Sequence, residues 1–322
     1  MIHNNIDFFN VEEISPNGQL LRFPLSLINS LGYENHKRGR FYGYRAIGSE
    51  LRFKTDSPFF DITLKSIKED CSVHVFFGDY SFKRYVLKEG VEQTLHIEIP
   101  DNILKNYDNL DRLGFNPRVI RIVIGYPGYV AYLGLNTFGY DVITPSVDDV
   151  PNKTLLIYGS SISHGSEALD YINSYAFILS RHLNINVLNK AIPGSCLGEY
   201  QMIDYLKKIN NNGVLVEFGV NTLRLFSVEE YNKRLEYIAD NLNGNLYLTS
   251  VLENGNRIND KAIYEKMLEY KKCLEKVNKE GIEIINPDSI IDSLSYLTFD
   301  LLHPSEFGQL KIAEALKDII KL

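Results

Sequence analysis

The sequence predicts two domains, an all-β domain followed by an α/β domain built on a doubly wound parallel sheet. Residues 1–148 contain short β-branched and aromatic segments separated by turn residues, as in β-rich domains. From residue 149 onward, short apolar segments alternate with longer segments of helical periodicity. Such alternation is typical of parallel strands connected by helices. The chain of 322 residues is long enough for two domains of ordinary size.

The first domain is expected to be a β-sandwich or jelly roll. Residues 61–64 alternate polar and apolar side chains, which is the pattern of a strand with one buried face. Turn signals such as Gly78-Asp79 and Pro127-Gly128 separate such segments. Several short strands at this spacing favour two packed sheets. The expected strands are residues 50–54, 59–64, 72–77, 83–87, 94–99 and 119–124.

Aromatic residues of this domain allow two interpretations. The segment G-R-F-Y-G-Y-R at residues 39–45, together with Tyr80 and Tyr85, could form a surface on which sugar rings stack. The same rings could instead pack in the core or between the domains, because burial is the commonest use of aromatic side chains. The second interpretation is the simpler one.

The second domain, residues 149–322, shows clear helix signals between its strands. Met202 and Leu206 belong to an apolar stripe with a period of 3.6 residues. Ser227 and Glu230 have the spacing of a capping box, which predicts that a helix begins there. Two further helices are expected at residues 262–280 and 305–321. The expected strands are residues 154–158, 186–188, 214–218, 245–251 and 282–285.

Polar residues follow the ends of three of these strands. Ser161 follows the first strand, Gly194 the second and Asn221 the third. Ligands of open parallel sheets bind in the crevice beyond the carboxyl ends of the strands. Asp300 and His303 lie on an expected loop before the last helix. Because a serine hydroxyl needs a base, and that base needs an orienting group, these residues predict a nucleophilic serine site.

Other residues could take the same roles. Residues 194–198 match the pattern G-x-C-x-G, which would make Cys196 the nucleophile, but no strand runs directly into this segment. His164 could be the base, although its closeness to Ser161 in the sequence would require a strained turn. Asp288 and Asp292 could compete with Asp300 as the orienting carboxylate.

Four segments resemble the four sequence blocks of the SGNH hydrolases, also called the GDSL esterase and lipase superfamily. They are residues 159–165 (G-S-S-I-S-H-G), Gly194, G-x-N at residues 219–221 and D-x-x-H-P at residues 300–304, in the order of the family. The β-rich first half resembles that of carbohydrate-esterase-like members. The resemblance implies a flavodoxin-like three-layer α/β fold at residues 149–322, preceded by a β-sandwich.

The resemblance also implies a role for each matched residue. Ser161 would be the nucleophile, His303 the base and Asp300 the residue that orients the imidazole. The oxyanion hole would consist of the backbone amides of Ser161 and Gly194 and the side-chain amide of Asn221. Apart from these matched roles, Ser160 and His164 are expected to line the pocket, with a hydrogen-bonding role as the alternative for His164. The sequence departs from the family pattern in two places, because Ser160 replaces an aspartate and Ala191 replaces a glycine.

Net charge, apolar runs and the spacing of cysteines and histidines argue against several other classes of protein. The net charge of −7 argues against a nucleic-acid-binding protein, which would usually present a basic face. No apolar run is long enough to span a membrane. The first ten residues lack the features of a signal peptide, and three widely spaced cysteines do not form a disulfide framework, which favours a cytoplasmic location. Histidines lack metal-ligand spacing, so neither a metal nor a cofactor is expected.

The expected function is hydrolysis of a small acyl ester, with O-acetyl on a carbohydrate favoured by the resemblance. The partner would therefore be a small-molecule or carbohydrate ester. A short-chain lipase or thioesterase is the nearest alternative, and a non-catalytic carbohydrate-binding module is another. The sequence leaves the oligomeric state open, a homodimer included.

Overall fold

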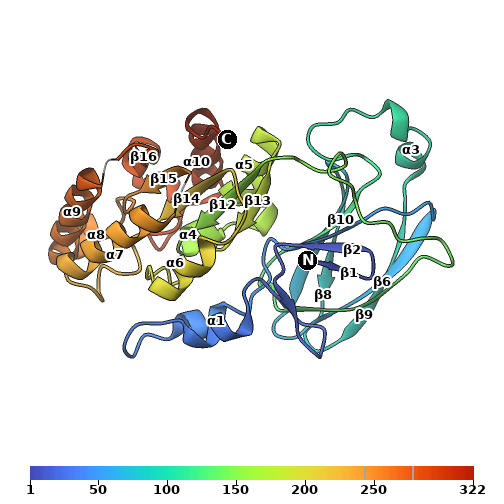
Figure 1. Cartoon of the computed structure of the whole chain (residues 1–322), viewed down its shortest axis with the longest axis horizontal. Helices are drawn as coiled ribbons and strands as arrows, with labels where there is room; N and C mark the ends of the chain where they lie inside the picture. Colours follow the sequence, from blue (N-terminus) through green and yellow to red (C-terminus); the bar gives the residue numbers. More distant parts are fainter. Residues whose placement is uncertain (243, 278) are drawn as a thin grey trace. The chain divides into compact units, whose positions relative to one another are not determined.

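The computed structural model describes residues 1–242, 244–277 and 279–322 (Figure 1). The chain forms two units, the first from Met1–Leu25 and Gly43–Asn152 and the second from Ser26–Tyr42 and Lys153–Leu322. We call Ser26–Tyr42 the strap, because this piece of the N-terminal half belongs to the C-terminal unit. The chain passes from the first unit to the second between Asn152 and Lys153, four residues after the expected boundary at residue 148. The strap was not expected, because no composition change in the sequence marks it.

The first unit is all β, as expected. Its strands pair antiparallel in a six-stranded sheet of order β1-β2-β5-β10-β7-β8 and a three-stranded sheet of order β11-β6-β9. Alternate residues of β6 (Phe60, Ile62 and Leu64) are buried, and they pack with Leu51 and Phe53 of β5 in one core. The strands are β1 (Ile2–His3), β2 (Ile6–Phe9), β5 (Glu50–Phe53), β6 (Phe59–Ser66), β7 (Cys71–Phe77), β8 (Tyr80–Leu87), β9 (Glu92–Glu98), β10 (Ile120–Ile124) and β11 (Val130–Asn136), with a separate pair β3 (Glu13–Ile14) and β4 (Leu20–Leu21).

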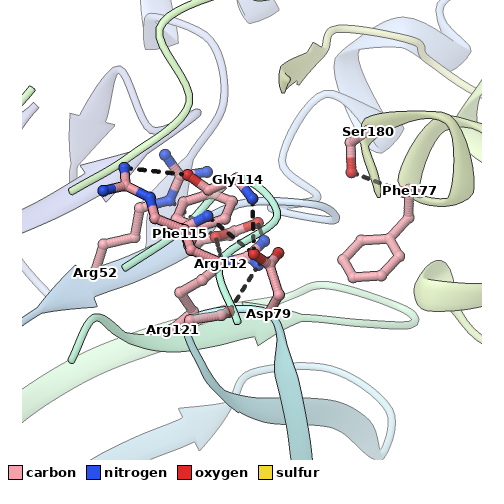
Figure 2. Close-up of polar contacts among 10 residues, drawn as sticks. Arg52, Asp79, Arg112, Gly114, Phe115, Arg121, Phe177 and Ser180 are labelled. Carbon is pink, nitrogen blue, oxygen red and sulfur yellow. Dashed lines mark hydrogen bonds and ion pairs between the residues drawn. The ribbon is translucent and has the colours of Figure 1, made fainter. Parts of the chain in front are cut away.

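Buried ion pairs connect β5 and β10 in this unit. Glu50 accepts hydrogen bonds from Nε of Arg52 and from Nε of Arg121, each at 2.8 Å. Both guanidinium groups lie over the ring of Phe115, and Arg121 also faces Asp79 at 3.9 Å (Figure 2). Burial acts to raise the pKa of Glu50, but the two arginines lower it to about 2. The carboxylate therefore stays ionised and stabilises the pairing of the two strands.

The second unit contains the predicted parallel sheet, with strand order β13-β12-β14-β15-β16. The chain runs from β12 to β13 on one side and then returns to β14 on the other side of β12, so the strand order reverses at β12. In such sheets a crevice lies beyond the carboxyl ends of the strands at the point of reversal. Leu155 and Ile157 of β12 face a core shared with α5 and α10, while the alternate residue Tyr158 bonds to the backbone that leads into α6. The strands are β12 (Thr154–Tyr158), β13 (Asn186–Asn189), β14 (Gly213–Glu217), β15 (Asn245–Thr249) and β16 (Ile282–Ile285).

Helices lie on both sides of this sheet, as the predicted three-layer fold requires (Figure 1). Helix α7 begins where the capping box predicts, because the Ser227 hydroxyl accepts from the Glu230 amide at 3.1 Å. The helix expected at 262–280 ends at Lys276, and residue 278 lies outside the described residues. The helices are α4 (Ser161–His164), α5 (Tyr175–Leu183), α6 (Tyr200–Leu206), α7 (Val228–Asn241), α8 (Asn256–Asn259), α9 (Lys261–Lys276) and α10 (Glu306–Ile319), besides α1 (Leu25–Ser30), α2 (Arg38–Tyr42) and α3 (Asp101–Leu104).

Five strands of the first unit carry no clear sequence signal. The strands β1, β3 and β4 have two residues each and β2 has four, which is too short for a recognisable alternation. In β11 the register shifts between Tyr132 and Gly134, and this bulge breaks the alternation. Across the described residues, no helix has both the length and the apolar character that crossing a bilayer would need.

Candidate active site

The turn after β12 places Ser161 at the start of a helix. Strand β12 ends at Tyr158, and the next helix, α4, begins at Ser161. Ser160 is the N-cap, and its hydroxyl accepts a hydrogen bond from the Ile162 amide at 3.1 Å. A Cβ on Gly159 would lie 2.3 Å from Oγ of Ser163, so only glycine fits between the strand and the helix. The turn therefore holds Ser161 in a fixed position, where it is 9% exposed.

Ser161, His303 and Asp300 form one hydrogen-bonded chain. Nε2 of His303 lies 2.7 Å from Oγ of Ser161, and Nδ1 of His303 lies 2.5 Å from Oδ2 of Asp300. Although 142 residues separate Ser161 from His303 in sequence, the loop before α10 brings the imidazole to the end of β12. A base that is oriented by a carboxylate and bonded to a hydroxyl is the arrangement that activates serine.

The loop around Asp300 is organised by the carboxylate itself. Its second oxygen, Oδ1, accepts hydrogen bonds from Oγ1 of Thr298 at 2.8 Å, from the Leu302 amide at 2.9 Å and from the His303 amide at 3.0 Å. Partial burial acts to raise the pKa of Asp300, but the hydrogen bonds from His303, Leu302 and Thr298 lower it to about 2. Asp300 is therefore ionised at neutral pH and can stabilise a positive charge on His303.

Three hydrogen-bond donors on the turns that follow β12, β13 and β14 have no acceptor within the described part of the chain. They are the amides of Ser161 and Gly194 and the side-chain nitrogen Nδ2 of Asn221. The loop carrying Gly194 turns through a left-handed residue, because Gly194 has a φ of +62°. Oδ1 of Asn221 accepts from the Cys196 amide at 2.9 Å, which fixes the carboxamide and leaves its NH₂ group available. Unused donors of this kind can stabilise an oxyanion.

Glu217 is a buried carboxylate beneath this turn that the sequence analysis did not identify. It ends β14 and accepts hydrogen bonds from the Ser160 amide at 2.7 Å and from the hydroxyls of Ser160 at 2.5 Å and Ser163 at 3.3 Å. Burial raises its pKa to about 7, and these hydrogen bonds together with the charge on His303 oppose the rise. A lone acidic residue inside the apolar segment 214–218 was the available sequence signal.

Two of the expected pocket-lining residues are buried instead. Ser160 and His164 are 0% exposed. The Ser160 hydroxyl is directed to Glu217 and to the start of α4, which is why it cannot line a pocket. Nδ1 of His164 contacts Oγ of Ser166 at 3.2 Å, while His303 occupies the position of the base beside Ser161. The prediction that these two residues line the pocket is therefore corrected.

The structure also places the alternative site residues elsewhere. Cys196 is fully buried, its Sγ donates to the Glu217 carbonyl at 3.3 Å, and burial raises the pKa of its thiol well above the usual value. Asp288 pairs with Lys271, and Asp292 pairs with Lys311. Cys196 therefore lacks the properties of a nucleophile, and within the described part of the chain neither aspartate is bonded to His303.

The strap is fastened to the loops that carry the site. Nε2 of His36 donates to the Gly194 carbonyl at 2.7 Å, and the Gly32 amide donates to Oε1 of Glu199 at 3.1 Å. The ring of Tyr33 packs edge-on against Phe226, with the ring centroids 4.7 Å apart. These contacts hold the strap on the second unit and support the loop of Gly194 from outside the sheet.

A cavity of about 410 Å³ lies among the strap and the loops that follow the strands. Its wall includes Gly194, Asn221 and Asp300, so it adjoins the hydrogen-bonded chain and the unused donors. The rest of the wall mixes amide, guanidinium and imidazole groups with leucine side chains. The other lining residues are His36, Arg38, Val220, Leu223, Arg224, Leu225, Asn254, Gly255, Asn256, Asn259, Ile263, Leu301 and Leu302.

Comparison with known proteins connects this geometry to a family. Residues 152–321 match the model of the GDSL-like Lipase/Acylhydrolase family. A multidomain esterase of Ruminococcus flavefaciens is 24% identical over 212 residues, which cover 59% of this chain and 25% of that protein. The chain thus spans about a quarter of the length of this curated relative.

Solved structures with the same fold extend over both units. The salicylyl-acyltransferase of a tetracycline biosynthetic pathway has a TM-score of 0.76 and 11% identity, covering 97% of this chain and 93% of its own. An acetyl xylan esterase from the rumen bacterium Butyrivibrio proteoclasticus has a TM-score of 0.55 and 14% identity, covering 99% and 95%. At these identities the likeness concerns the fold.

Proposed function

We propose that this chain, which belongs to the GDSL-like lipase/acylhydrolase family, is an ester hydrolase that removes small acyl groups, above all O-acetyl, from a carbohydrate. The observation that carries the proposal is the chain Ser161–His303–Asp300 beside three unused hydrogen-bond donors. The names of the relatives, a multidomain esterase and an acetyl xylan esterase, support the choice of reaction.

In the first half of the reaction, His303 accepts the proton of Ser161 through Nε2 while Oγ attacks the carbonyl carbon of the ester. The carbonyl oxygen becomes negatively charged and receives hydrogen bonds from the amides of Ser161 and Gly194 and from Nδ2 of Asn221. Asp300 stabilises the imidazolium. The C–O bond to the alcohol then breaks, and His303 returns the proton to the departing oxygen, which leaves an acyl-Ser161 ester.

In the second half, a water molecule takes the place of the alcohol. His303 accepts a proton from this water, and the hydroxide oxygen attacks the acyl carbonyl. The same donors hold the second oxyanion. The bond to Oγ of Ser161 breaks, the proton on His303 passes to Oγ, and the carboxylic acid leaves. The serine and the base are thereby restored.

The character of the cavity supports a polar alcohol. Asn221, Asn254, Asn256 and Asn259 supply carboxamides to its wall, and such groups hydrogen-bond to hydroxyls. A lipase would need an extended apolar surface for a long acyl chain, whereas the leucines of this wall are interspersed with polar groups. We therefore favour an acetylated sugar over a lipid.

The test of the nucleophile is Ser161→Ala with p-nitrophenyl acetate as substrate. We expect turnover to fall by about 10⁴-fold or more, because the step that forms the acyl-enzyme is lost. A serine-reactive phosphonate should label wild-type protein at Ser161. The matched control is Ser180→Ala, since among the described residues the Ser180 hydroxyl bonds only to the Phe177 carbonyl within α5 (Figure 2). Turnover in Ser161→Ala close to that of wild type would refute the proposal.

The acyl group is tested with p-nitrophenyl esters of increasing length. We expect kcat/KM to be highest for acetyl and to fall towards octanoyl. A steady rise to octanoyl would favour the lipase or thioesterase alternative instead. Wild-type protein that releases no acid from any ester, yet binds glycans, would favour the carbohydrate-binding module.

A further inference from the structure

We propose that Arg38 of the strap is a specificity-determining residue that binds a carboxylate on the alcohol portion of the ester, so that the preferred substrate is an acetylated sugar acid. The proposal rests on the proposed esterase function and names its substrate class. The observation behind it is that the cationic side chain of Arg38 lines the cavity at the candidate site, although Arg38 lies far in the sequence from the four family blocks.

The position of Arg38 is defined by Gly194. A Cβ on Gly194 would lie 3.3 Å from both Cδ and Nη1 of Arg38, so the end of the arginine side chain packs against this glycine. Arg38 lines the same cavity as Asn221 and Asp300. A substrate whose carbonyl oxygen receives the Gly194 amide would therefore bring its alcohol portion close to the guanidinium group.

Arg38 is exposed and its side chain is unpaired, which distinguishes it from two nearby arginines. The guanidinium group makes no hydrogen bond or ion pair with the described residues. Arg224, the other arginine of the cavity wall, is paired with Asp260 at 2.8 Å. Arg40, also on the strap, donates through Nε to the Leu31 carbonyl at 2.8 Å. The guanidinium of Arg38 is therefore available for a ligand.

The charge of the cavity wall favours an anion that carries a single negative charge. Asp300 is the one carboxylate among the described lining residues, and it is engaged with His303. One unpaired guanidinium has the charge and the planar donor fork to bind one carboxylate in a bidentate manner. A phosphate monoester carries more charge than this single cation balances.

The strap holds Arg38 in place before a substrate arrives. His36, two residues earlier, is bonded to the Gly194 carbonyl at 2.7 Å. Gly39, one residue later, is buried against Leu31 and Ser195, because a Cβ there would lie 2.8 Å from Oγ of Ser195. Anchors on both sides restrict the backbone of Arg38, and such preorganisation reduces the entropy lost on binding.

The experiment compares three methyl glycosides that are acetylated at the same hydroxyl and differ only at C6, namely the glucoside, the glucuronoside and the glucoside 6-phosphate. For each enzyme we measure kcat/KM and take the ratio of glucuronoside to glucoside. We expect wild-type protein to prefer the glucuronoside and Arg38→Gln to lower the ratio by about ten- to a hundredfold, as a hydrogen bond to a charged group gives. Arg38→Lys should restore part of the ratio.

Lys37→Gln is the matched control, because it removes the same charge from the neighbouring position of the strap. Lys37 is exposed and is not among the residues that line the cavity. Its ratio should equal that of wild type. An Arg38→Gln variant that loses activity equally on all three substrates would overturn the proposal and assign Arg38 to the fold or the oxyanion. A wild-type preference for the 6-phosphate, or no preference at all, would overturn it as well.

A binding measurement separates this proposal from the proposed function. Unacetylated methyl glucuronoside is titrated calorimetrically into Ser161→Ala protein, which requires no turnover. Tighter binding than that of methyl glucoside, lost in the Ser161→Ala, Arg38→Gln double variant and weakened by salt, supports the anion site even if no ester is hydrolysed. Equal binding of the two sugars would overturn the anion site, even in an enzyme that is an active esterase.

Discussion

Asp300→Asn should abolish most activity while it leaves the loop intact. Asparagine keeps an oxygen at the position of Oδ1, which accepts from Thr298, Leu302 and the His303 amide. At the position of Oδ2 it places an NH₂ group 2.5 Å from Nδ1 of His303, and this group can only donate. The imidazole must then carry its proton on Nε2, where it can no longer accept the proton of Ser161.

The wrong tautomer should lower kcat by about 10⁴-fold, which corresponds to about 5.5 kcal/mol of transition-state stabilisation. The assay is steady-state hydrolysis of p-nitrophenyl acetate, with circular dichroism to verify folding. Because the pKa of Asp300 is about 2, the carboxylate stays ionised above about pH 4, and the acid limb of the wild-type pH profile should not report its titration. Asp292→Asn is the control, since Asp292 pairs with Lys311 at the surface. A folded Asp300→Asn enzyme within about tenfold of wild type would refute the orienting role.

Two further predictions concern buried groups near Ser161. The pKa of Glu217 is raised from 4.5 to about 7, so between these two pH values the folded protein retains a proton that the unfolded chain releases. The free energy of unfolding should therefore fall by about 3 kcal/mol as the pH rises from 4.5 to 7. Urea titrations between pH 5 and 8 should show a smaller decline in Glu217→Gln than in wild type. Glu229→Gln, in which an exposed glutamate is replaced, should decline like wild type. Parallel declines in the wild type and both variants would contradict the raised pKa. Iodoacetamide should leave native activity intact, because Cys196 is fully buried with a raised thiol pKa; rapid loss of activity, with Cys196 modified, would contradict its burial.

Local sequence patterns are enough to specify the architecture of the second unit. Each strand of the parallel sheet is a short apolar run, and the capping box at Ser227 marks the start of α7, so local chemistry and hydrophobic periodicity are sufficient there. The carboxyl ends of parallel strands meet at one edge of a sheet, so the sequence already places Ser161, Gly194 and Asn221 at a common edge. Asp300 and His303 stood out by their spacing before the last helix, and the resemblance to the SGNH blocks implied the role of each.

Other features depend on contacts between segments that are far apart in the sequence. The strap at Ser26–Tyr42 has no marker in its own composition, because its place is set by bonds such as His36 to Gly194 rather than by local preference. Whether a polar residue lines a pocket or is buried depends on its partners, which is why Ser160 turned inward to Glu217. The exposed, unpaired state of Arg38 likewise follows from what surrounds it, and a sequence does not display surroundings.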